Sequence, residues 1–274
     1  MASSKVSDTV EKLKNKIITN HRNGAFLPGL IWTLIRTDFK TRYYGTLGGY
    51  IWTLVKPLSM LVVLLTVFSV IFSMDPHYAL NLVIGLFLYD FFSESTKTGL
   101  TCLHAKAFLL TKTKFPAWVV VLTSFSSAFI TVSVFSIATC AYISIFRRPL
   151  GLLEISFFGF YIFLFLMIII GIALAGSVLF LRYRDINQIW EVILQAGFFV
   201  APIIYPLDIV PEKFRSYLYV WPPTAVIQFS RSVLVKGAIP TIQDHVMLLG
   251  SATVVLFLGI VLYCRLAPRS LERL

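Results

Sequence analysis

The sequence has few charged residues and is especially poor in acidic ones. Only 14% of its 274 residues are charged, whereas soluble domains carry roughly 25%. Apolar residues make up 57% of the chain, and the mean hydropathy is +0.82. Several apolar runs reach the roughly 20 residues that a helix needs to cross about 30 Å of hydrocarbon. Because alternating segments of about 10 residues are not evident, we expect an all-α integral membrane protein.

Cysteines are scarce, and no leader segment is evident. Cys102, Cys140 and Cys264 lie far apart without metal-ligand spacing, so we expect free thiols rather than a disulfide. The first 25 residues are polar and lack the apolar core of a signal peptide. We therefore expect the N-terminus to be retained and to remain in the cytoplasm.

The sequence also lacks motifs for catalysis or for an energy source. It contains no Gly-Lys pair, which excludes the phosphate-binding loop G-x-x-x-x-G-K-[ST]. It has no Asp-x-Asp pair, and its four histidines lie in separate regions. We expect no catalytic residue, no metal site and no cofactor in this chain. Asp90, Glu94 and Glu191 lie near the ends of apolar runs, whereas a proton-coupled carrier usually places ionisable groups at the midplane.

Basic residues, in contrast, are plentiful. The net charge is +11, which is compatible with nucleic-acid binding or with loops held against anionic lipids. The positive residues are scattered over several loops, so the sequence favours membrane lipids as partners and no nucleic acid.

Hydropathy predicts six membrane spans. They cover about 51–73, 79–93, 115–146, 152–181, 189–205 and 246–263. A cytoplasmic segment (1–50) precedes this transmembrane domain (51–266), and a cytoplasmic tail (267–274) follows it. The second span has only 15 residues and is near 22 Å long, so it must lie beside protein or thin the bilayer. The polar stretch 94–114 is expected to form a cytoplasmic loop.

The distribution of basic residues predicts the orientation. Of the 24 Lys and Arg residues, 18 fall in the segments expected inside and 6 in those expected outside. This split obeys the positive-inside rule and places both ends in the cytoplasm.

An amphipathic helix is predicted from Leu27 to Tyr44, with Pro28 in its first turn. Apolar positions such as Ile31 and Leu34 share one face, while Arg36 and Lys40 share another. This pattern is typical of a helix that lies in the membrane interface rather than across it.

The stretch 206–241 is fairly apolar but contains Trp221-Pro222-Pro223 and four basic residues. A seventh span broken by the prolines would move the basic tail outside. The sequence favours two short re-entrant helices that dip into the outer leaflet and return. Broken backbone at that depth is tolerated only beside protein or a water-filled cavity, so the segment is expected to border a pore or its gate.

Aromatic residues are abundant, with 24 Phe, 12 Tyr and 5 Trp. An interfacial belt or a packed core is the ordinary use of each. Some could instead stack on the rings of a sugar polymer that slides through a pore. The candidate channel or gate aromatics are Trp52, Phe198, Phe199, Tyr205, Tyr217, Tyr219 and Trp221.

Two sets of residues resemble motifs of a known family. The first is R-x-D-x-K-x-R-Y followed by L-G-x-x-W-x-x-x-x-P-L, which is present from Arg36 to Leu58. The second is RYRDI at 182–186, then P-x-I-Y-P-L at 202–207 and V-P-E-K-F-R at 210–215. This order resembles the membrane (permease) subunit of bacterial ABC-2 type polysaccharide exporters. WPPT at 221–224 replaces a commoner Asn-Pro pair, which leaves the shape of an outer gate open.

The resemblance implies a homodimer that forms one channel and binds two copies of a cytoplasmic ABC ATPase, which carries the ATP and Mg. It implies an undecaprenyl-pyrophosphate-linked polysaccharide as cargo and the bacterial inner membrane as location. O-antigen is preferred over capsule or teichoic acid. A proton-coupled carrier and a membrane glycosyl- or acyltransferase remain as alternatives of other classes.

Charged residues on the cytoplasmic side are candidates for coupling to the ATPase or for attracting the lipid pyrophosphate. Ordinary membrane anchoring is the alternative for each. These candidates are Arg36, Asp38, Lys40, Arg42, Lys106, Lys112, Arg182, Arg184 and Asp185.

Overall fold

The computed structural model describes residues 26–43, 49, 51–71, 76–112 and 116–271. Every element in these ranges is a helix, as the apolar runs predicted. The chain divides into two units, Met1–Tyr44 and Gly45–Leu274, and each is described by itself.

The first unit contains helix α2, Phe26–Tyr43. This confirms the helix predicted over 27–44. The Thr33 and Thr37 hydroxyls donate to the carbonyls of Gly29 and Thr33, one turn earlier. The polar residues 1–23 lie outside the described residues.

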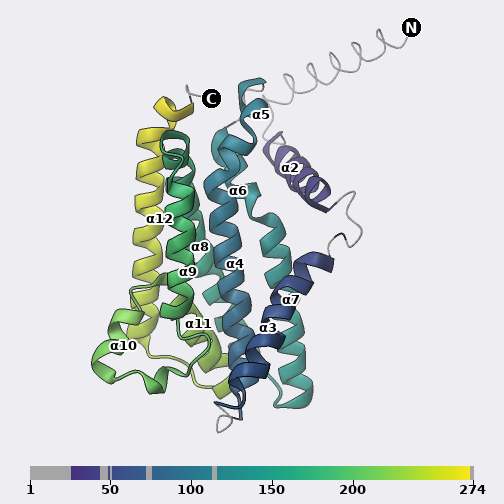
Figure 1. The fold of residues 1–274 in the computed structure, drawn as a ribbon, viewed down its shortest axis with the longest axis vertical. Coiled ribbons are helices and arrows are strands. Elements are labelled where there is room, and N and C mark those ends of the chain that lie inside the picture. Colours follow the sequence, from purple (N-terminus) through teal and green to yellow (C-terminus); the bar gives the residue numbers. More distant parts are fainter. Residues whose placement is uncertain (1–25, 44–48, 50, 72–75, 113–115, 272–274) are drawn as a thin grey trace. The chain divides into compact units, whose positions relative to one another are not determined.

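The second unit contains the remaining described helices, shown in Figure 1. In chain order they are α3 (Ile51–Phe68), α4 (Tyr78–Ala105), α5 (Ala107–Lys112), α6 (Ala117–Ser124), α7 (Ser126–Phe146), α8 (Leu152–Arg182), α9 (Ile186–Val200), the 3₁₀ turn η1 (Leu207–Ile209), α10 (Glu212–Leu218), α11 (Pro222–Arg231), the π-helical turn η2 (Ser232–Lys236) and α12 (Ile242–Leu271).

Helix α8 is the centre of this unit and packs along both α4 and α12 (Figure 1). Small residues permit the close packing. A Cβ on Gly259 of α12 would lie 2.2 Å from the Gly171 carbonyl oxygen of α8, and one on Gly99 of α4 would lie 2.5 Å from the Ala173 Cβ. Small residues at helix crossings let backbones approach closely, which is a main source of stability between helices in lipid.

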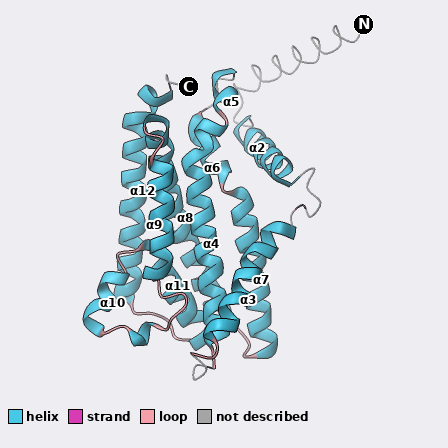
Figure 2. Cartoon of the chain, in the orientation of Figure 1, coloured by secondary structure: helices cyan, strands magenta, loops and turns pink. Residues whose placement is uncertain are grey.

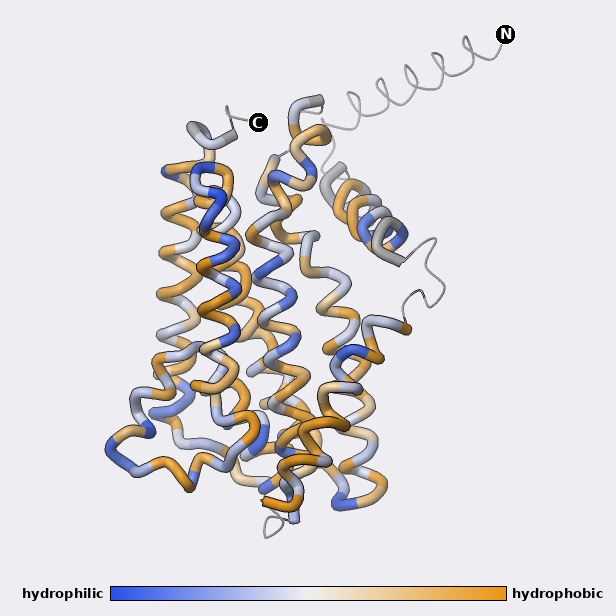
Figure 3. Tube along the Cα trace, in the orientation of Figure 1, coloured by the Kyte–Doolittle hydropathy of each residue, from blue (hydrophilic) through white to orange (hydrophobic). Residues whose placement is uncertain are grey.

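The helices of the second unit gather their ends at two opposite poles (Figure 1). The α5 end contains α5, the α8–α9 turn and the C-terminal part of α12. The α10 end contains α10, the α7–α8 turn and the start of α4. Between the poles most helices are apolar, whereas α4 and α9 carry hydrophilic positions along their length (Figure 3).

Four of the described stretches are long and apolar enough to cross a membrane: Ile51–Phe68, Ala117–Phe146, Leu152–Arg182 and Ile242–Pro268. They coincide with four of the six predicted spans. The other two predicted spans correspond to α4, which is more polar, and to α9, which has only 15 residues.

Helix α4 corrects one expectation. The stretch 94–114 was predicted to be a loop, yet the helix continues to Ala105 and α5 follows at Ala107. Ser95 and Thr96 are fully buried. The Thr96 and Thr98 hydroxyls donate to the carbonyls of Phe92 and Glu94, each at 2.8 Å. Protein packing and these local bonds let polar residues extend a helix that hydropathy ends at residue 93.

The third predicted span, 115–146, is interrupted at Phe125, where α6 ends and α7 begins. The Thr123 and Ser124 hydroxyls donate to the carbonyls of Val120 and Val121 at 3.2 and 2.7 Å. Such bonds compete with the helical backbone pattern, and they often bend a helix. The interruption is therefore encoded by two small polar residues within an apolar run.

The stretch between α9 and α12 consists of short helices joined by loops (Figure 2). Pro222 and Pro223 occupy the first two positions of α11, where the absent N–H costs no helical bond. Gly237 ends η2 with a φ of +67°, a left-handed conformation that glycine adopts easily. The prolines therefore begin a helix here rather than break one.

Candidate functional site

A cleft of about 430 Å³ lies between α3 and α4, with Phe198 of α9 at its side. Most of its lining is apolar, including Pro57 and Val63 of α3 and Leu86 of α4. Lys56, Asp90 and Ser93 add polar groups, and Asp90 and Ser93 lie one turn apart on α4. A mostly apolar concavity with a few polar groups is the usual form of a binding site.

Three polar contacts join α9 to α4 near this cleft. The Tyr89 hydroxyl donates to the Leu194 carbonyl. The Trp190 indole N–H donates to the Thr96 hydroxyl at 3.0 Å, and Lys97 lies 3.8 Å from the Glu191 carboxylate. The Glu191 carboxylate thus faces a lysine on the neighbouring helix.

At the α10 end, the side chain of Arg231 is buried, with only 6% of its surface exposed. Its guanidinium donates to the carbonyls of Asn81 (2.8 Å), Ile203 (3.0 Å) and Pro202. A Cβ on Gly85 would lie 2.5 Å from the guanidinium, so only glycine leaves room for it there. One side chain thereby connects the end of α11, the start of α4 and the chain that follows α9.

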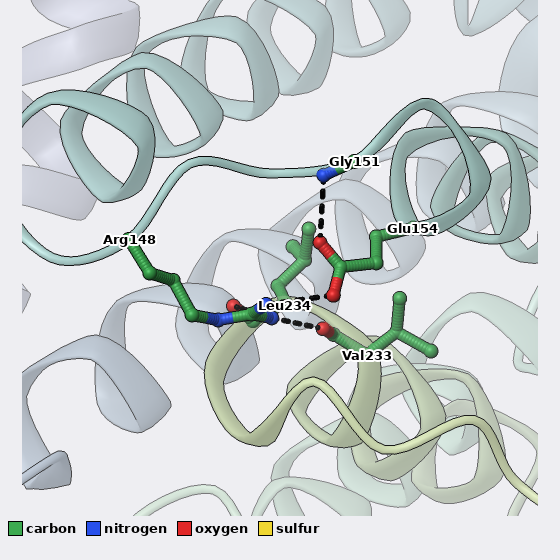
Figure 4. A network of polar contacts seen from close by, with 5 residues as sticks. All are labelled: Arg148, Gly151, Glu154, Val233 and Leu234. Carbon is green, nitrogen blue, oxygen red and sulfur yellow. Dashed lines mark hydrogen bonds and ion pairs between the residues drawn. The ribbon is translucent and has the colours of Figure 1, made fainter.

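A second arginine, Arg148 in the α7–α8 turn, contacts η2, the turn that directly follows Arg231 (Figure 4). The Arg148 guanidinium forms an ion pair with Glu154 at 2.7 Å and donates to the carbonyls of Val233 (2.9 Å) and Leu234 (3.3 Å). Glu154 also accepts the Gly151 N–H at 2.9 Å, which caps the start of α8. Charge-assisted bonds of this kind are stronger than neutral ones, so η2 is tied to α8.

A polar pocket of about 390 Å³ opens at the α10 end between the start of α4, the 205–208 chain, α11 with η2, and the start of α12. Tyr205, Tyr219 and Arg231 belong to its lining. Burial raises the pKa of Tyr219, and the Asp244 carboxylate adds to this effect. The phenol is therefore neutral at physiological pH.

The predicted channel or gate aromatics occupy different environments. Trp52, Phe199 and Tyr217 are more than 60% exposed. Tyr205 donates to the Phe199 and Val200 carbonyls and lines the polar pocket together with Tyr219.

Two of these aromatics pack inside the unit. Phe198 lines the cleft, and its ring lies 5.3 Å from that of Tyr89. Trp221 packs against Gly197 and against the rings of Phe92 (5.7 Å) and Trp190 (6.5 Å). Trp221 thus packs in the core, which was the alternative to a channel or gate role for this residue.

At the α5 end, two predicted coupling regions come together. The Phe180 ring lies 6.0 Å from the His104 ring of α4 and 5.2 Å from the Arg184 guanidinium. Lys106 directly follows α4, and its N–H donates to the Cys102 carbonyl. Arg182, Arg184 and Asp185 are exposed in the α8–α9 turn. Phe180 thus joins the exposed His104, Arg182 and Arg184 in one basic region at the α5 end, with Lys106 half-buried at the end of α4.

The other coupling candidates lie on α2 and at the end of α5. Arg36 and Lys40 are exposed on α2, one turn apart, and Asp38 is half-buried. The side chains of Arg42 and Lys112 lie outside the described residues.

Neither Arg148 nor Arg231 was identified from the sequence as a residue that joins separate segments of the fold. Both were counted only as positive charges outside the membrane. A usable signal existed for Arg231, because an arginine inside an apolar helical segment points to a specific role. The described residues contain no group of His, Cys, Asp or Glu that could hold a metal ion.

The helices, the cleft and the four span-length apolar stretches define a multi-pass helical membrane protein. A family model for the ABC-2 type transporter matches residues 29–235. The chain therefore belongs to the ABC-2 type transporter family, which confirms the family predicted from its motifs.

Curated relatives match most of the chain. An O-antigen export system permease protein RfbA of Klebsiella pneumoniae is 27% identical over 79% of this chain and 84% of its own length. An RfbA of Myxococcus xanthus is 25% identical over 83% and 88%. A polysialic acid transport protein KpsM of Escherichia coli is 24% identical over 84% and 90%.

Proposed function

We propose that this chain is the channel-forming permease subunit of an ATP-driven exporter that moves a lipid-linked polysaccharide across the bacterial inner membrane. The observation that carries the proposal is the extent of the similarity. Relatives named for O-antigen export and for polysialic acid transport match 79 to 84% of the chain. O-antigen is the preferred cargo, and capsule or teichoic acid is the alternative within the family.

The proposed topology has six spans, with α4 as the second and α9 as the fifth. Both termini and the α5 end lie in the cytoplasm, and the short helices between α9 and α12 dip into the outer leaflet and return. The concentration of basic residues at segments assigned to the inside supports this orientation. The irregular backbone from 201 to 209 is compatible with it, because much of that chain is buried by protein.

Two copies of the chain form the proposed channel. Helix α3 is compatible with this arrangement, because its apolar window is only 11% buried within one copy, although the windows of Ala117–Phe146 and Ile242–Pro268 are little more buried, at 17% each. The cleft between α3, α4 and Phe198 would face the channel. ATP binding would close the partner ATPases, and their movement would enter through α2 and the basic region at the α5 end. Helices α3 and α9 would then separate across the dimer axis.

The central experiment is copurification of the chain with a tagged ABC ATPase, followed by mass spectrometry of the bound lipid-linked glycan. Deletion of the gene is expected to abolish the surface polysaccharide, and the intact gene is expected to restore it. Polysaccharide at the normal level in the deletion strain would contradict the proposal.

Charge reversal tests the coupling candidates. The double variant Arg36→Glu with Arg42→Glu is expected to lose export at a normal membrane level. Lys213→Glu is the matched control, because Lys213 is exposed on α10, at the end of the second unit that is assigned to the outside. Normal export by the double variant would remove these arginines from the mechanism.

Assays of the purified chain alone distinguish the proposed permease from a carrier or an enzyme. A proton-coupled carrier would transport without ATP when the purified chain is placed alone in vesicles. A glycosyl- or acyltransferase would turn over an activated donor in detergent. The proposed permease is expected to do neither.

A further inference from the structure

The polar pocket at the α10 end is formed within a single copy of the chain. Its volume of about 390 Å³ lies within the roughly 300–1,000 Å³ range of small-molecule sites. Four separate segments contribute to its walls, and representative lining residues are Asn81, Tyr205, Asp208, Tyr219, Gln228 and Asp244. The pocket is distinct from the cleft beside α3, with which it shares no lining residue.

The walls of this pocket are held in place by hydrogen bonds. Arg231 connects the carbonyls of Asn81, Pro202 and Ile203 behind the pocket. The Tyr78 hydroxyl donates to the Ile204 carbonyl at 3.0 Å. A concavity whose walls are already fixed binds a ligand with little ordering cost, so the pocket is preformed.

The charges of the lining disfavour a small anion as the ligand. Two carboxylates, Asp208 and Asp244, balance two cations, Arg231 and Lys236. Arg231 directs three donor atoms to backbone carbonyls, whereas a phosphate or carboxylate site usually offers its arginine fork to the ligand. The pocket therefore suits a ligand without net charge.

The remaining chemistry favours a ligand that is rich in hydroxyl groups. Hydroxyl groups can donate to the Asp208 carboxylate and to the Gln228 amide oxygen. The Gln228 amide nitrogen donates to the Pro202 carbonyl at 3.4 Å, and one Asp244 oxygen accepts from Thr241. Tyr205 uses its hydroxyl to bond the carbonyls of Phe199 and Val200, which leaves its ring as the part available to a ligand. Tyr219 packs against Phe229 with ring centroids 6.2 Å apart. Polar acceptors beside aromatic rings match the hydroxyl groups and C–H faces of a sugar.

We propose that this pocket is a carbohydrate subsite that binds a short stretch of the exported glycan on the outer side of the permease. The proposal rests on the export of polysaccharide proposed above and adds a site within each copy, beside the shared channel. Because the described lining residues have no net excess of charge, the subsite would recognise uncharged sugar units rather than the pyrophosphate head group.

The test measures equilibrium binding of glycan fragments to the purified full-length chain in nanodiscs. The fragments are released by mild acid from the surface polysaccharide of the same cells, and calorimetry gives the affinity. Tyr219→Ala is expected to weaken binding about tenfold, as loss of one well-placed aromatic contact does. Tyr219→Phe keeps the ring and is expected to bind like the original chain.

Phe214→Ala is the matched control, because Phe214 is 49% exposed on α10 and does not line the pocket. Asp208→Asn provides a second test that does not depend on the packing of Tyr219, since Asp208 is exposed. It is expected to weaken binding severalfold. Thermal unfolding of each variant verifies that it is folded.

Two results would overturn the subsite. One is an original chain that binds no fragment at millimolar concentration. The other is equal affinity in the original chain, Tyr219→Ala and Asp208→Asn. The deletion strain separates this outcome from failure of the proposed function. Loss of surface polysaccharide on deletion, with unaltered fragment binding by both pocket variants, would remove the subsite and retain the exporter.

Discussion

Helices α3 and α8 are both strongly apolar, yet their surroundings differ. Within their apolar windows, 56% of α8 but only 11% of α3 is buried inside the chain. Helix α8 packs on α4, α12 and several shorter elements, whereas α3 packs mainly on α4. Hydropathy identifies both helices but does not distinguish a helix of the core from one whose face is left for lipid or another protein.

The residues that separate the two helices are the small ones. Helix α8 carries Gly171, Ala173 and Gly176 at its contacts with neighbouring helices. The outward face of α3 carries branched side chains such as Val62 and Val63, both more than half exposed. Apolar burial gains little when lipid already surrounds a side chain, so close contact at small residues decides which helices assemble.

The strongest test of this comparison is Gly259→Leu in α12. A Cβ at this position would overlap the Gly171 backbone, so the two helices must separate along their contact. We expect a loss of about 3 kcal/mol or more, or no folded protein. Thermal unfolding followed by tryptophan fluorescence in detergent measures the loss.

Gly250→Leu on the same helix is its matched control. A Cβ there would meet nothing within 4 Å, and we expect a change below about 0.5 kcal/mol. Equal unfolding midpoints for the two variants would contradict the role of close packing between α8 and α12.

The next test compares the truncation to alanine of one apolar side chain in each of the two helices. Ile168 of α8 is fully buried, so Ile168→Ala is expected to cost about 2–4 kcal/mol through the cavity it leaves. Val62 of α3 is 62% exposed, and Val62→Ala is expected to change stability by less than about 0.5 kcal/mol. A large loss of stability on Val62→Ala in a single copy of the chain would show that the outward face of α3 packs against other residues of that copy.

Polar contacts add to apolar packing at the first turn of α8, and Arg148→Met tests them. The variant removes the ion pair with Glu154 and leaves the carbonyls of Val233 and Leu234 without this donor. We expect a loss of about 1–3 kcal/mol and faster proteolysis at the α10 end. Arg147→Met, at the exposed neighbouring position, is expected to do neither.

The smallest effect is expected for the ion pair between α9 and α4. Its exposure is intermediate between the buried side chains of α8 and the exposed side chains of α3. Lys97 and Glu191 lie 3.8 Å apart, and their side chains are 37% and 38% exposed. A double-mutant cycle with alanine at both positions is expected to give a coupling below about 1 kcal/mol. A coupling well above this value would mean that the pair is shielded from solvent.

Local sequence predicts the helices that combine a long apolar run with clear ends. The run of α8 begins beside Gly151 and Glu154, which cap it, and ends at the basic Arg182. Helix α12 begins at Thr241 and Asp244, which exchange the reciprocal bonds of a capping box. These signals lie within a few residues of the helix that they define.

The features that sequence did not predict depend on distant partners. The polar half of α4 is helical because α8 and α6 cover it. The carbonyls that accept from Arg148 lie about 85 positions further along the chain. Among the candidate site residues, the charges of the α8–α9 turn are exposed, whereas Trp221 is part of the packing between helices.

The contact of Arg231 with Asn81 joins residues 150 positions apart, which constrains the order of assembly. During synthesis α4 enters the membrane long before α11, so the space beside Gly85 stays open until the arginine arrives. Arg231 then hydrogen-bonds both the chain after α9 and the start of α4. The α10 end of the second unit is thus completed only after α11 has been synthesised.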